Sequence, residues 1–573
     1  MIEEYGPQTE FSQTLHAEKY RTRGETFRAA MNRIAGALAD DTDHYQAFRA
    51  ILLDQRFLPG GRIQAAMGST KTVTPYNCFV SGTIEDSFVD GHGSIMQRAM
   101  EAAATMRMGG GIGYDFSTLR PNGDTISKLQ SQSSGPVSFM DIFDSVCRCI
   151  ASSGHRRGAQ MGVLRIDHPD IEEFIHAKQN ESRLNGFNVS VGVTDSFMEH
   201  LNTGEPFPLQ WGGKVYRTVD PQSLWDTLMR STWDWAEPGV LFIDRINEMN
   251  NLWYCEEIAA TNPCGEQPLP PYGACLLGSF NLTKYVVEME AGGIRAFDFR
   301  QFGDDIEEVV RAMDNVVDRA VYPMYEQEKE AKSKRRMGLG VTGLANALES
   351  MGLRYGSPEF VSWMNDILKL LANRAYATSA DLAKEKGSFP EFEAEAYLAS
   401  RYIQHLSSKV QEMIKTQGLR NSHLTSIAPT GTISMTADNV SSGIEPVFSY
   451  SQERIVQTRD GASTVKLEDY GYRVFGVEGK KADEVTIDEH LAVLACATEW
   501  MDSAVSKTCN VPSDMSWDEF KQVYVQAWQL GCKGITTFRM GGQRAPILKS
   551  EEGNEDPPAA CYVDPETGRK ECE

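Results

Sequence analysis

Short apolar runs alternate with longer amphipathic stretches along most of this chain. Apolar, β-branched runs predict strands at Gly162–Ile166, Phe187–Val193, Val240–Ile243 and Leu424–Ala428. Helical patterns and helix-forming residues predict helices at Ser94–Met108, Ile306–Val321 and Asn365–Lys386. Strands that are separated by helices in this way favour an α/β domain.

The two ends of the chain depart from this alternation. Residues 1–70 are mostly polar with helical patterns, whereas residues 71–548 carry the strands and helices of the predicted main domain. Residues 549–573 are polar and rich in proline, glycine and glutamate, which is typical of a flexible tail. Before this tail, Ser516 and Glu519 predict a capping box.

The composition is that of a globular, cytoplasmic protein. Of its 573 residues, 41% are hydrophobic and 24% are charged. No run of about 18 apolar residues predicts a membrane span, and the first residues lack the basic and apolar regions of a secretory signal. The net charge of −23 argues against binding to a nucleic-acid polymer. A local loop can still hold the phosphate of a single nucleotide.

Eleven cysteines are spaced irregularly along the chain. Their odd number and spacing argue against a disulfide framework, so each thiol is either a packing residue or a group with a chemical role. No Cys-x-x-Cys pair occurs. Because this removes the usual zinc-site spacing, we expect no metal ligands among these residues.

The segment Asn262–Pro270 is the strongest candidate for chemistry. Its prolines exclude a regular helix and favour extended geometry before Pro263. In an extended segment Asn262, Cys264 and Glu266 would face the same side. An amide, a thiol and a carboxyl group can then orient a substrate, transfer a hydrogen atom and move a proton. The alternative is a turn with a buried cysteine.

Four further cysteines could act with this segment. Cys78 and Cys275 lie in apolar surroundings, where either residue alone is more typical of a structural cysteine. Cys561 and Cys572 lie in the tail, which spans about 3.3 Å per residue when extended and could carry thiols into a buried site. A disordered tail with incidental thiols is the alternative for these two.

One loop is a candidate for binding phosphate. It consists of Thr430, Gly431, Thr432, Ile433 and Ser434. The loop follows a predicted strand and offers backbone N–H groups and hydroxyls to an anion. It lacks the spacing and the lysine of a Walker A loop, and an ordinary turn is an equal alternative.

Two other segments have features of a phosphate-binding site. Gly338–Gly343 matches the pattern GxGxxG, but basic and polar residues precede it, so we interpret it as close helix packing rather than as a dinucleotide loop. Arg157 lies in a small basic loop, and arginine can bind a phosphate through two hydrogen bonds. A solvated charged turn is the alternative there.

Together these segments resemble the large, catalytic subunits of ribonucleotide reductases. The resemblance runs from about Phe57 to Leu548, with the matching segments in the order of the family. The segments are LPGGRIQAAMGS, NCFVSGTIEDS, GGGIGYDFSTLRPNGD, HRRGAQMGVLRIDHPDIEEFI, FNVSV, PGVLFIDRIN, NPCGEQPLP, CLLGSFNL, RMGLGVTGLA and APTGTISM. Each of them is a weak signal, but their joint order is specific.

The resemblance implies a ten-stranded α/β barrel of two five-stranded halves with a central finger loop, preceded by a helical N-terminal region. By motif position, Cys264 would carry the thiyl radical that removes the 3′ hydrogen of the substrate. Glu266 would accept the proton of the 3′-hydroxyl, and Asn262 would bind the ribose. Cys78 and Cys275 would reduce the 2′ position and become a disulfide.

Other positions follow from the same resemblance. The loop from Thr430 to Ser434 would bind the phosphates of the ribonucleotide substrate. Asp86, Arg120 and Arg157 would bind an allosteric deoxynucleoside triphosphate (dNTP), and an effector site between subunits would favour a homodimer.

The resemblance also assigns a role to the tail. Cys561 and Cys572 would regenerate the dithiol by exchange with a thioredoxin-like reductant. Their spacing is wider than that of the cysteine pairs typical of the family.

The source of the radical separates the classes of this family. Class I subunits receive the radical from a separate subunit through paired tyrosines, and the stretch Gly534–Met540 has no such pair. The chain is more similar to class II enzymes in three segments, GCKGITTFR, NPCGEQPLP and PGVLFIDRIN. In class II, cleavage of the cobalt–carbon bond of adenosylcobalamin supplies the radical. The Asp-x-His-x-x-Gly motif of base-off cobalamin binding is absent, and class II enzymes do not require it.

Two alternatives to the class II enzyme remain at this point. The chain could be a class I large subunit without a recognisable tyrosine relay, or a catalytically inactive nucleotide-binding regulator on the same fold. Class III fits poorly because its four-cysteine zinc cluster is missing. The sequence leaves open whether the substrate is a ribonucleoside diphosphate or triphosphate.

Overall fold

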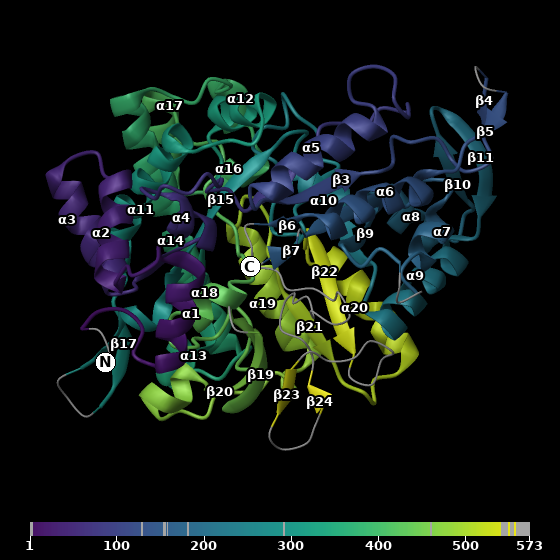
Figure 1. Cartoon of the computed structure of the whole chain (residues 1–573). Helices are drawn as coiled ribbons and strands as arrows, with labels where there is room; N and C mark the ends of the chain where they lie inside the picture. The colour runs from purple at the N-terminus through teal and green to yellow at the C-terminus, as the bar shows by residue number, and fades with distance from the viewer. Residues whose placement is uncertain are drawn as a thin grey trace.

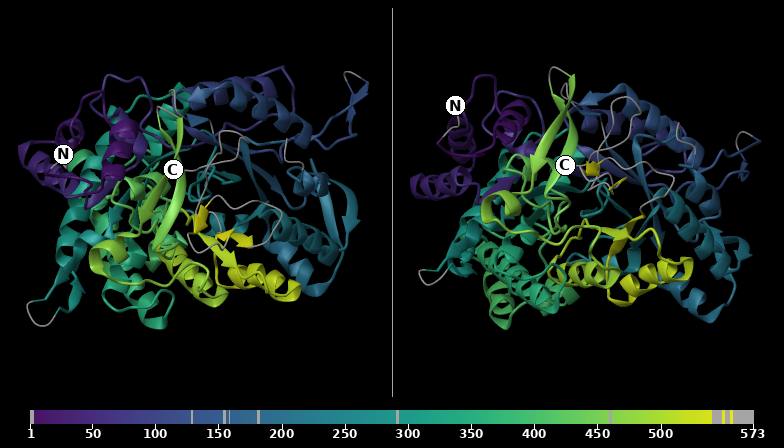
Figure 2. Two further views of the ribbon diagram at one scale, coloured as in Figure 1. Left: turned by 60° about the horizontal axis from the view of Figure 1, so that its bottom comes forward. Right: turned by 90° about the horizontal axis from the view of Figure 1, so that it is seen from below.

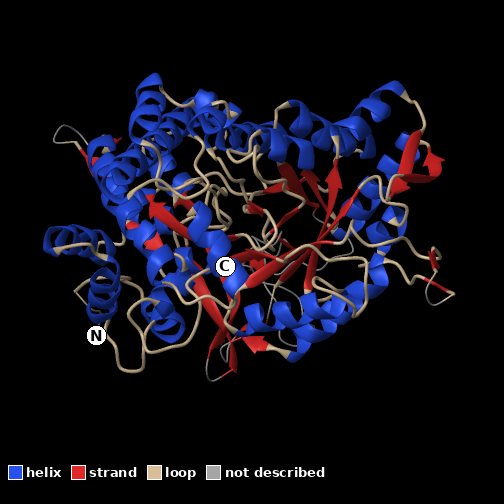
Figure 3. Cartoon of the chain, turned by 90° about the horizontal axis from the view of Figure 1, so that it is seen from above, coloured by secondary structure: helices blue, strands red, loops and turns tan. Residues whose placement is uncertain are grey.

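The computed structural model describes residues 4–127, 130–152, 156–157, 159–179, 183–289, 293–458, 461–539, 548–550 and 555–556. The strands of the largest sheet lie in the centre of the molecule with helices around them, and small hairpins lie at its edges (Figures 1 and 3). The expected α/β class is therefore confirmed.

One ten-stranded sheet dominates the described part of the chain. Its strands follow the order β1-β15-β2-β3-β8-β9-β12-β22-β21, and β18 also pairs with β15. Their bounds are β1 (Phe57–Pro59), β2 (Cys78–Val80), β3 (Gly111–Asp115), β8 (Gln160–Arg165), β9 (Phe187–Val193), β12 (Gly239–Phe242), β15 (Ala274–Asn281), β18 (Met337–Thr342), β21 (Thr508–Val511) and β22 (Gly534–Arg539).

Parallel strands form two groups in this sheet. Strands β2, β3, β8, β9 and β12 are parallel to one another, and antiparallel pairing joins them to β15 on one side and to β22 on the other. In the second group β15 is parallel to β18, and β21 is parallel to β22. The ten strands agree with the expected α/β barrel of two five-stranded halves.

The predicted strand at residues 424–428 lies between β18 and the residues before β21. It is joined to them by two isolated parallel bridges, Leu339 to Thr425 and Ile427 to Val505, rather than by a regular ladder. The reason is that the Asp502 carboxylate accepts the N–H groups of Leu424 at 2.6 Å and of Thr425 at 3.1 Å. A side chain thus takes hydrogen bonds that a neighbouring strand would otherwise receive.

Long helices cover the outer side of the sheet. They include α5 (Ile95–Arg107), α6 (Pro136–Cys149), α9 (Pro221–Trp235), α11 (Phe299–Arg319), α12 (Tyr325–Lys334), α14 (Pro358–Lys386), α17 (Ser408–Gln417), α19 (Ile487–Trp500) and α20 (Trp517–Gln529). The three predicted helices correspond to α5, α11 and α14, and α20 begins with the predicted capping box of Ser516 and Glu519. One large cluster of buried apolar side chains joins these helices to the sheet.

The interpretation of Gly338–Gly343 as helix packing is wrong. Its first five residues belong to β18, which is buried along its whole length. The basic residues before it end helix α12, and the strand begins only at Met337. A Cβ atom on Gly340 would lie 2.2 Å from the carbonyl oxygen of Ser426, so glycine lets the segment 424–428 approach the strand closely.

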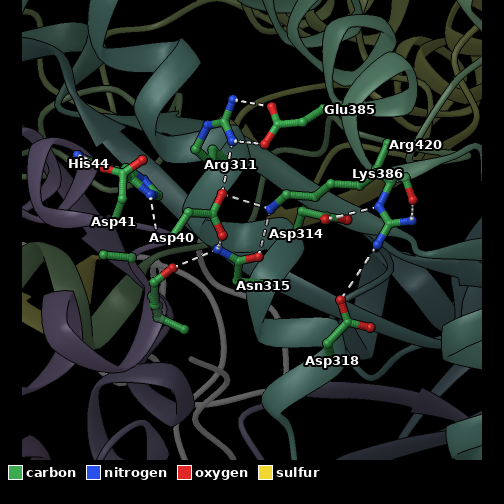
Figure 4. Close-up of polar contacts among 12 residues, drawn as sticks. Asp40, Asp41, His44, Arg311, Asp314, Asn315, Asp318, Glu385, Lys386 and Arg420 are labelled. Atoms are coloured by element: carbon green, nitrogen blue, oxygen red, sulfur yellow. Dashed lines mark hydrogen bonds and ion pairs between the residues drawn. The ribbon is translucent and has the colours of Figure 1, made fainter.

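Four helices and β1 make up most of the described residues before residue 70. The helices are α1 (Glu10–Tyr20), α2 (Phe27–Leu38), α3 (Thr42–Leu53) and α4 (Gly61–Ala66). Between α2 and α3, the carboxylate of Asp40 accepts hydrogen bonds from Lys386 at 2.7 Å, Arg311 at 2.9 Å and Asn315 at 2.8 Å (Figure 4). These contacts connect the N-terminal helices to α11 and α14.

The same contacts decide the charge of Asp40. Partial burial would raise its pKa, but the hydrogen bonds from Lys386 and Arg311 lower the pKa well below its ordinary value. The carboxylate therefore stays charged at neutral pH. A second group lies nearby on α11, where Arg420 binds both Asp314 and Asp318 (Figure 4).

A long hairpin extends from the body of the molecule beside the N-terminal helices (Figure 2). Its strands are β19 (Ser451–Thr458) and β20 (Gly461–Glu468), which pair in register along their length.

Among the described helices, none combines the length and the apolar character that crossing a membrane requires.

A buried carboxyl group lies in α13 (Leu344–Ser350), the helix that follows β18. It belongs to Glu349, and its carboxylate accepts the N–H groups of Lys480 at 2.7 Å and of Tyr355 at 3.3 Å. Burial nevertheless raises the pKa of Glu349 from 4.5 to about 7. The folded protein therefore binds this proton more tightly than the unfolded chain does.

We expect Glu349 to make the free energy of unfolding fall as the pH rises from about 4.5 to about 7. In Glu349→Gln the amide oxygen can accept the same N–H groups without titrating. This variant should therefore gain about 3 kcal/mol over the parent between pH 4.5 and pH 8. Urea denaturation at several pH values measures the difference. The same pH dependence in both proteins would show that Glu349 is not the titrating group.

Candidate active site

A short hairpin enters the space enclosed by the sheet. Its strands are β13 (Ala260–Thr261) and β14 (Pro268–Leu269), and residues 262–267 form its tip, the finger loop. Strand β13 packs on β2, β3 and β8. A separate cluster of buried apolar side chains joins the hairpin to the inner face of the strands. The central finger loop implied by the family resemblance is thus present.

The finger loop is a turn rather than an extended segment, which corrects the expectation from the sequence. The N–H of Gly265 donates to the carbonyl of Asn262, and Gly265 has a φ of 83°. The N–H of Gln267 donates to Asn262 Oδ1 at 2.9 Å. The prolines exclude a helix as expected, but glycine in the left-handed region allows the chain to reverse direction.

The structure places Cys78, Asn262 and Glu266 together in the interior. Asn262 Nδ2 donates to Cys78 Sγ at 3.1 Å, and Cys78 Sγ donates to Glu266 Oε1 at 3.8 Å. All three residues are buried, with Glu266 fully inaccessible. The side chains meet because the turn directs both ends of the finger loop towards β2.

Cys275 lies opposite Cys78 across two antiparallel strands. The residues are direct partners in the pairing of β15 with β2. Direct partners in an antiparallel pair have Cα atoms about 4.5–5.5 Å apart, within the range of about 4.4–6.8 Å that a disulfide bridges. The two thiols therefore lie where they could form a disulfide.

Both thiols are held in their protonated form. Burial raises the pKa of Cys78 well above its ordinary value, and the neighbouring Glu266 raises it further. Burial also raises the pKa of Cys275, to which Asp502 contributes. Neither buried thiol is therefore a thiolate at neutral pH.

Cys264 lies at the tip of the finger loop and is partly exposed. It lines a cavity of about 150 Å³ between the finger loop, β9, β12 and β22. Gly265, Asn188, Gly239, Ser506 and Lys533 also line this cavity. The cavity gives a small molecule access to Cys264 on the side of these strands.

Neighbouring residues fix the position of the finger loop. Asn188 Nδ2 donates to the carbonyl of Pro263 at 2.6 Å, and Ser426 Oγ donates to the carbonyl of Glu266 at 2.9 Å. On β3, a Cβ atom at Gly113 would lie 1.8 Å from the carbonyl oxygen of Thr261. Only glycine at this position lets the hairpin reach its site.

Sequence reasoning did not find these supporting residues. Gly113 was part of a glycine-rich segment with a family resemblance, but nothing in the pattern indicated that it faces Thr261. Asn188 and Ser426 lie in apolar runs, and no sequence signal distinguishes them from other polar residues in strands. Their role depends on contacts with residues more than 70 positions away.

The candidate phosphate loop closes around Thr430 and continues into α18 (Gly431–Met435). Thr430 has a φ of 52°, and its hydroxyl accepts the N–H of Gly443 at 2.7 Å and lies 3.0 Å from the hydroxyl of Thr342. Ser434 Oγ lies 3.0 Å from Ser442 Oγ. The loop is therefore supported by β18 and by residues 441–443.

The candidate effector residues are only partly described. Arg120 Nε donates to Asp86 Oδ2 at 2.7 Å, so two of them form an ion pair. Arg157 belongs to the short strand β7 (Arg156–Arg157), and its side chain lies outside the described residues. Cys561 and Cys572 also lie outside the described residues.

Comparison with known proteins identifies relatives over most of the chain. Residues 76–538 match the family described as the ribonucleotide reductase barrel domain. A vitamin B12-dependent ribonucleoside-diphosphate reductase of Thermoplasma acidophilum is 33% identical over 540 residues, which cover 88% of this chain and 66% of that protein. A protein of the same name from Mycobacterium tuberculosis is 34% identical over 579 residues, which cover 94% of this chain and 79% of that protein.

A more distant relative has a different name. The ribonucleoside-diphosphate reductase subunit alpha of Chlamydia muridarum is 25% identical over 433 residues, which cover 65% of this chain and 40% of that protein.

Proposed function

The chain belongs to the ribonucleotide reductase barrel-domain family, and we propose that it reduces ribonucleotides to 2′-deoxyribonucleotides with adenosylcobalamin as its cofactor. The observation that carries this proposal is the buried group of Cys78, Asn262 and Glu266, with Cys275 opposite Cys78. The names of the two more similar relatives support a diphosphate substrate and the cobalamin cofactor.

Each of these residues has a distinct role in the proposed reaction. A thiyl radical on Cys264 removes the 3′ hydrogen of the ribose and returns it at the end of the reaction, which restores the radical, and Glu266 accepts the proton of the 3′-hydroxyl. Asn262 orients the ribose. The 2′-hydroxyl leaves as water, and the two electrons and two protons that this requires come from the thiols of Cys78 and Cys275, which become a disulfide.

The cavity beside Cys264 is suited to the nucleoside part of the cofactor. Apolar strand surface and small residues such as Gly239 and Gly265 leave room for a flat ring, and Asn188 and Ser506 offer polar groups. When bound, adenosylcobalamin supplies a carbon radical by cleavage of its cobalt–carbon bond. The protein contributes the position of Cys264 and a site that excludes water.

The other nucleotide contacts belong to the same proposal. The loop from Thr430 to Ser434 binds the substrate phosphates through backbone N–H groups and hydroxyls. Asp86, Arg120 and Arg157 bind a dNTP effector, and the protein acts as a homodimer. Cys561 and Cys572 transfer electrons from a thioredoxin-like reductant to the active-site pair.

A class I subunit and an inactive regulator are less well supported. Strand β22 contains no tyrosine, and the relative named as a reductase subunit alpha is less similar to this chain than the B12-dependent relatives. Nucleotide binding alone would not need two buried thiols beside a carboxyl group. These features favour the cobalamin-dependent enzyme.

We expect the purified chain to form deoxyribonucleotides only when adenosylcobalamin is present. The assay contains ribonucleoside diphosphates, dithiothreitol and a dNTP effector in light-protected tubes, with a parallel set of ribonucleoside triphosphates. Product without the cofactor would contradict the proposal. No product with either substrate set would favour a missing radical-generating subunit or the inactive regulator.

A further inference from the structure

A buried ammonium group lies close to the finger loop, at the wall of the cavity beside Cys264, and takes no part in the proton and hydrogen transfers of the proposed reaction. Lys533 precedes β22 and is 3% exposed. Its Nζ donates to three consecutive main-chain carbonyls, those of Met501 at 2.9 Å, Asp502 at 2.8 Å and Ser503 at 2.5 Å. The three donors of an ammonium group match this arrangement of acceptors.

Lys533 binds the carbonyls of a turn, residues 501–504, and the last residue of this turn contacts the finger loop. The N–H of Ala504 donates to the carbonyl oxygen of Glu266 at 3.0 Å. Ser426 Oγ donates to the same oxygen at 2.9 Å and to the carbonyl of Ala504 at 3.3 Å. The turn and the segment 424–428 thus hold the carbonyl of Glu266 from two sides.

The opposite side of the turn is also fixed. The side chain of Asp502 accepts the N–H groups of Leu424 and Thr425 and the hydroxyl of Tyr376 at 2.7 Å. Asp502 is 3% exposed. Its carboxylate therefore attaches the turn to the segment 424–428, while its carbonyl faces Lys533.

We propose that Lys533 is a positioning residue, which holds the turn 501–504 so that Ala504 fixes the main chain of the finger loop at Glu266. This inference rests on the proposed function only for its effect on turnover. Glu266 must lie within hydrogen-bond reach of the 3′-hydroxyl, and Cys264 is two residues away in the same loop. A small displacement of the turn therefore moves the acid–base group and the radical residue together.

The environment of Lys533 supports this role. Burial lowers the pKa of Lys533 to about 8, and the charge of Asp502 opposes this effect. The group is therefore mostly protonated at neutral pH and keeps all three donors. Burying an ammonium group costs free energy, so its three hydrogen bonds to a single turn indicate that the position of that turn matters.

The test compares Lys533→Met with the parent holoenzyme by two measurements. Methionine keeps the apolar stem of lysine and removes the donors. We expect kcat at saturating adenosylcobalamin to fall about 10- to 100-fold, with KM for the substrate within about twofold, because the finger loop moves while Thr342 and Gly443 still hold Thr430 of the phosphate loop. Hydrogen exchange with mass spectrometry should show faster exchange in peptides that contain Ala504 and the finger loop, but not in β9 or β15.

Two further variants sharpen the test. Lys480→Met removes another buried ammonium group, which pairs with Glu489 away from the turn, and should change neither kcat nor the exchange of Ala504. Lys533→Gln places two N–H donors on a shorter side chain. It should recover part of kcat and part of the protection of Ala504 against exchange, and it decides the test if Lys533→Met does not fold.

The outcomes distinguish the two proposals. Unchanged exchange at Ala504, or faster exchange spread evenly over the barrel, would overturn the positioning role of Lys533. If the parent protein has no reductase activity, the proposed function fails, but the local exchange in the variants still decides whether Lys533 holds the turn.

Discussion

Cys264→Ser is expected to reduce deoxyribonucleotide formation at least about a thousandfold while leaving the fold intact. Serine has nearly the size of cysteine, but its O–H bond is too strong for a radical to form in place of the thiyl group. Because Cys264 is partly exposed and lies at the tip of the finger loop, its replacement by a residue of similar size removes little buried packing. We therefore expect a stability change within about 0.5 kcal/mol.

The measurement compares product formed per hour by the variant and the parent, with adenosylcobalamin and dithiothreitol in excess. Cys255→Ser is the matched control, because Cys255 is an exposed cysteine nine residues earlier in the chain. It should retain the activity of the parent. Full activity of Cys264→Ser would remove Cys264 from the reaction and with it the proposed mechanism.

Much of the fold followed from local patterns in the sequence. The run Phe187–Val193 became β9 without change, and the capping box at Ser516 begins α20 as predicted. The interpretation of Gly338–Gly343 as helix packing relied on the basic and polar residues before it, whereas Gly340 lets the segment 424–428 approach β18 closely. The strand predicted at residues 424–428 is not a regular one, because the Asp502 carboxylate accepts two of its N–H groups.

The candidate site was predictable in its residue types but not in its geometry. Spacing alone suggested that Asn262 and Glu266 share a face of an extended segment, whereas they meet at Cys78 through a turn. Nothing local connects Cys78 with Cys275, and their pairing depends on β2 lying beside β15. The family resemblance supplied that connection, since residues so far apart carry no mutual signal in one sequence.

Oxidation of Cys78 and Cys275 should limit how much deoxyribonucleotide each chain forms without an external reductant. A parent protein reduced in advance and then freed of dithiothreitol should form one deoxyribonucleotide per chain from this pair. It should form a second only if Cys561 and Cys572 pass on their electrons. Cys275→Ser should form none, because a single thiol cannot supply both electrons, and the loss should again be at least about a thousandfold.

Rapid-quench product counts and thiol titration before and after the reaction measure both quantities. Each deoxyribonucleotide formed should consume two thiols. Cys561→Ser should limit the parent to one product, which tests the tail separately from the active site. Cys496→Ser is the control for replacing a buried thiol, since Cys496 lies on α19, away from the finger loop, and its thiol donates to the carbonyl of Val361. Turnover by Cys275→Ser with normal stoichiometry would mean that Cys78 has a different partner, and the disulfide across β2 and β15 would have to be abandoned.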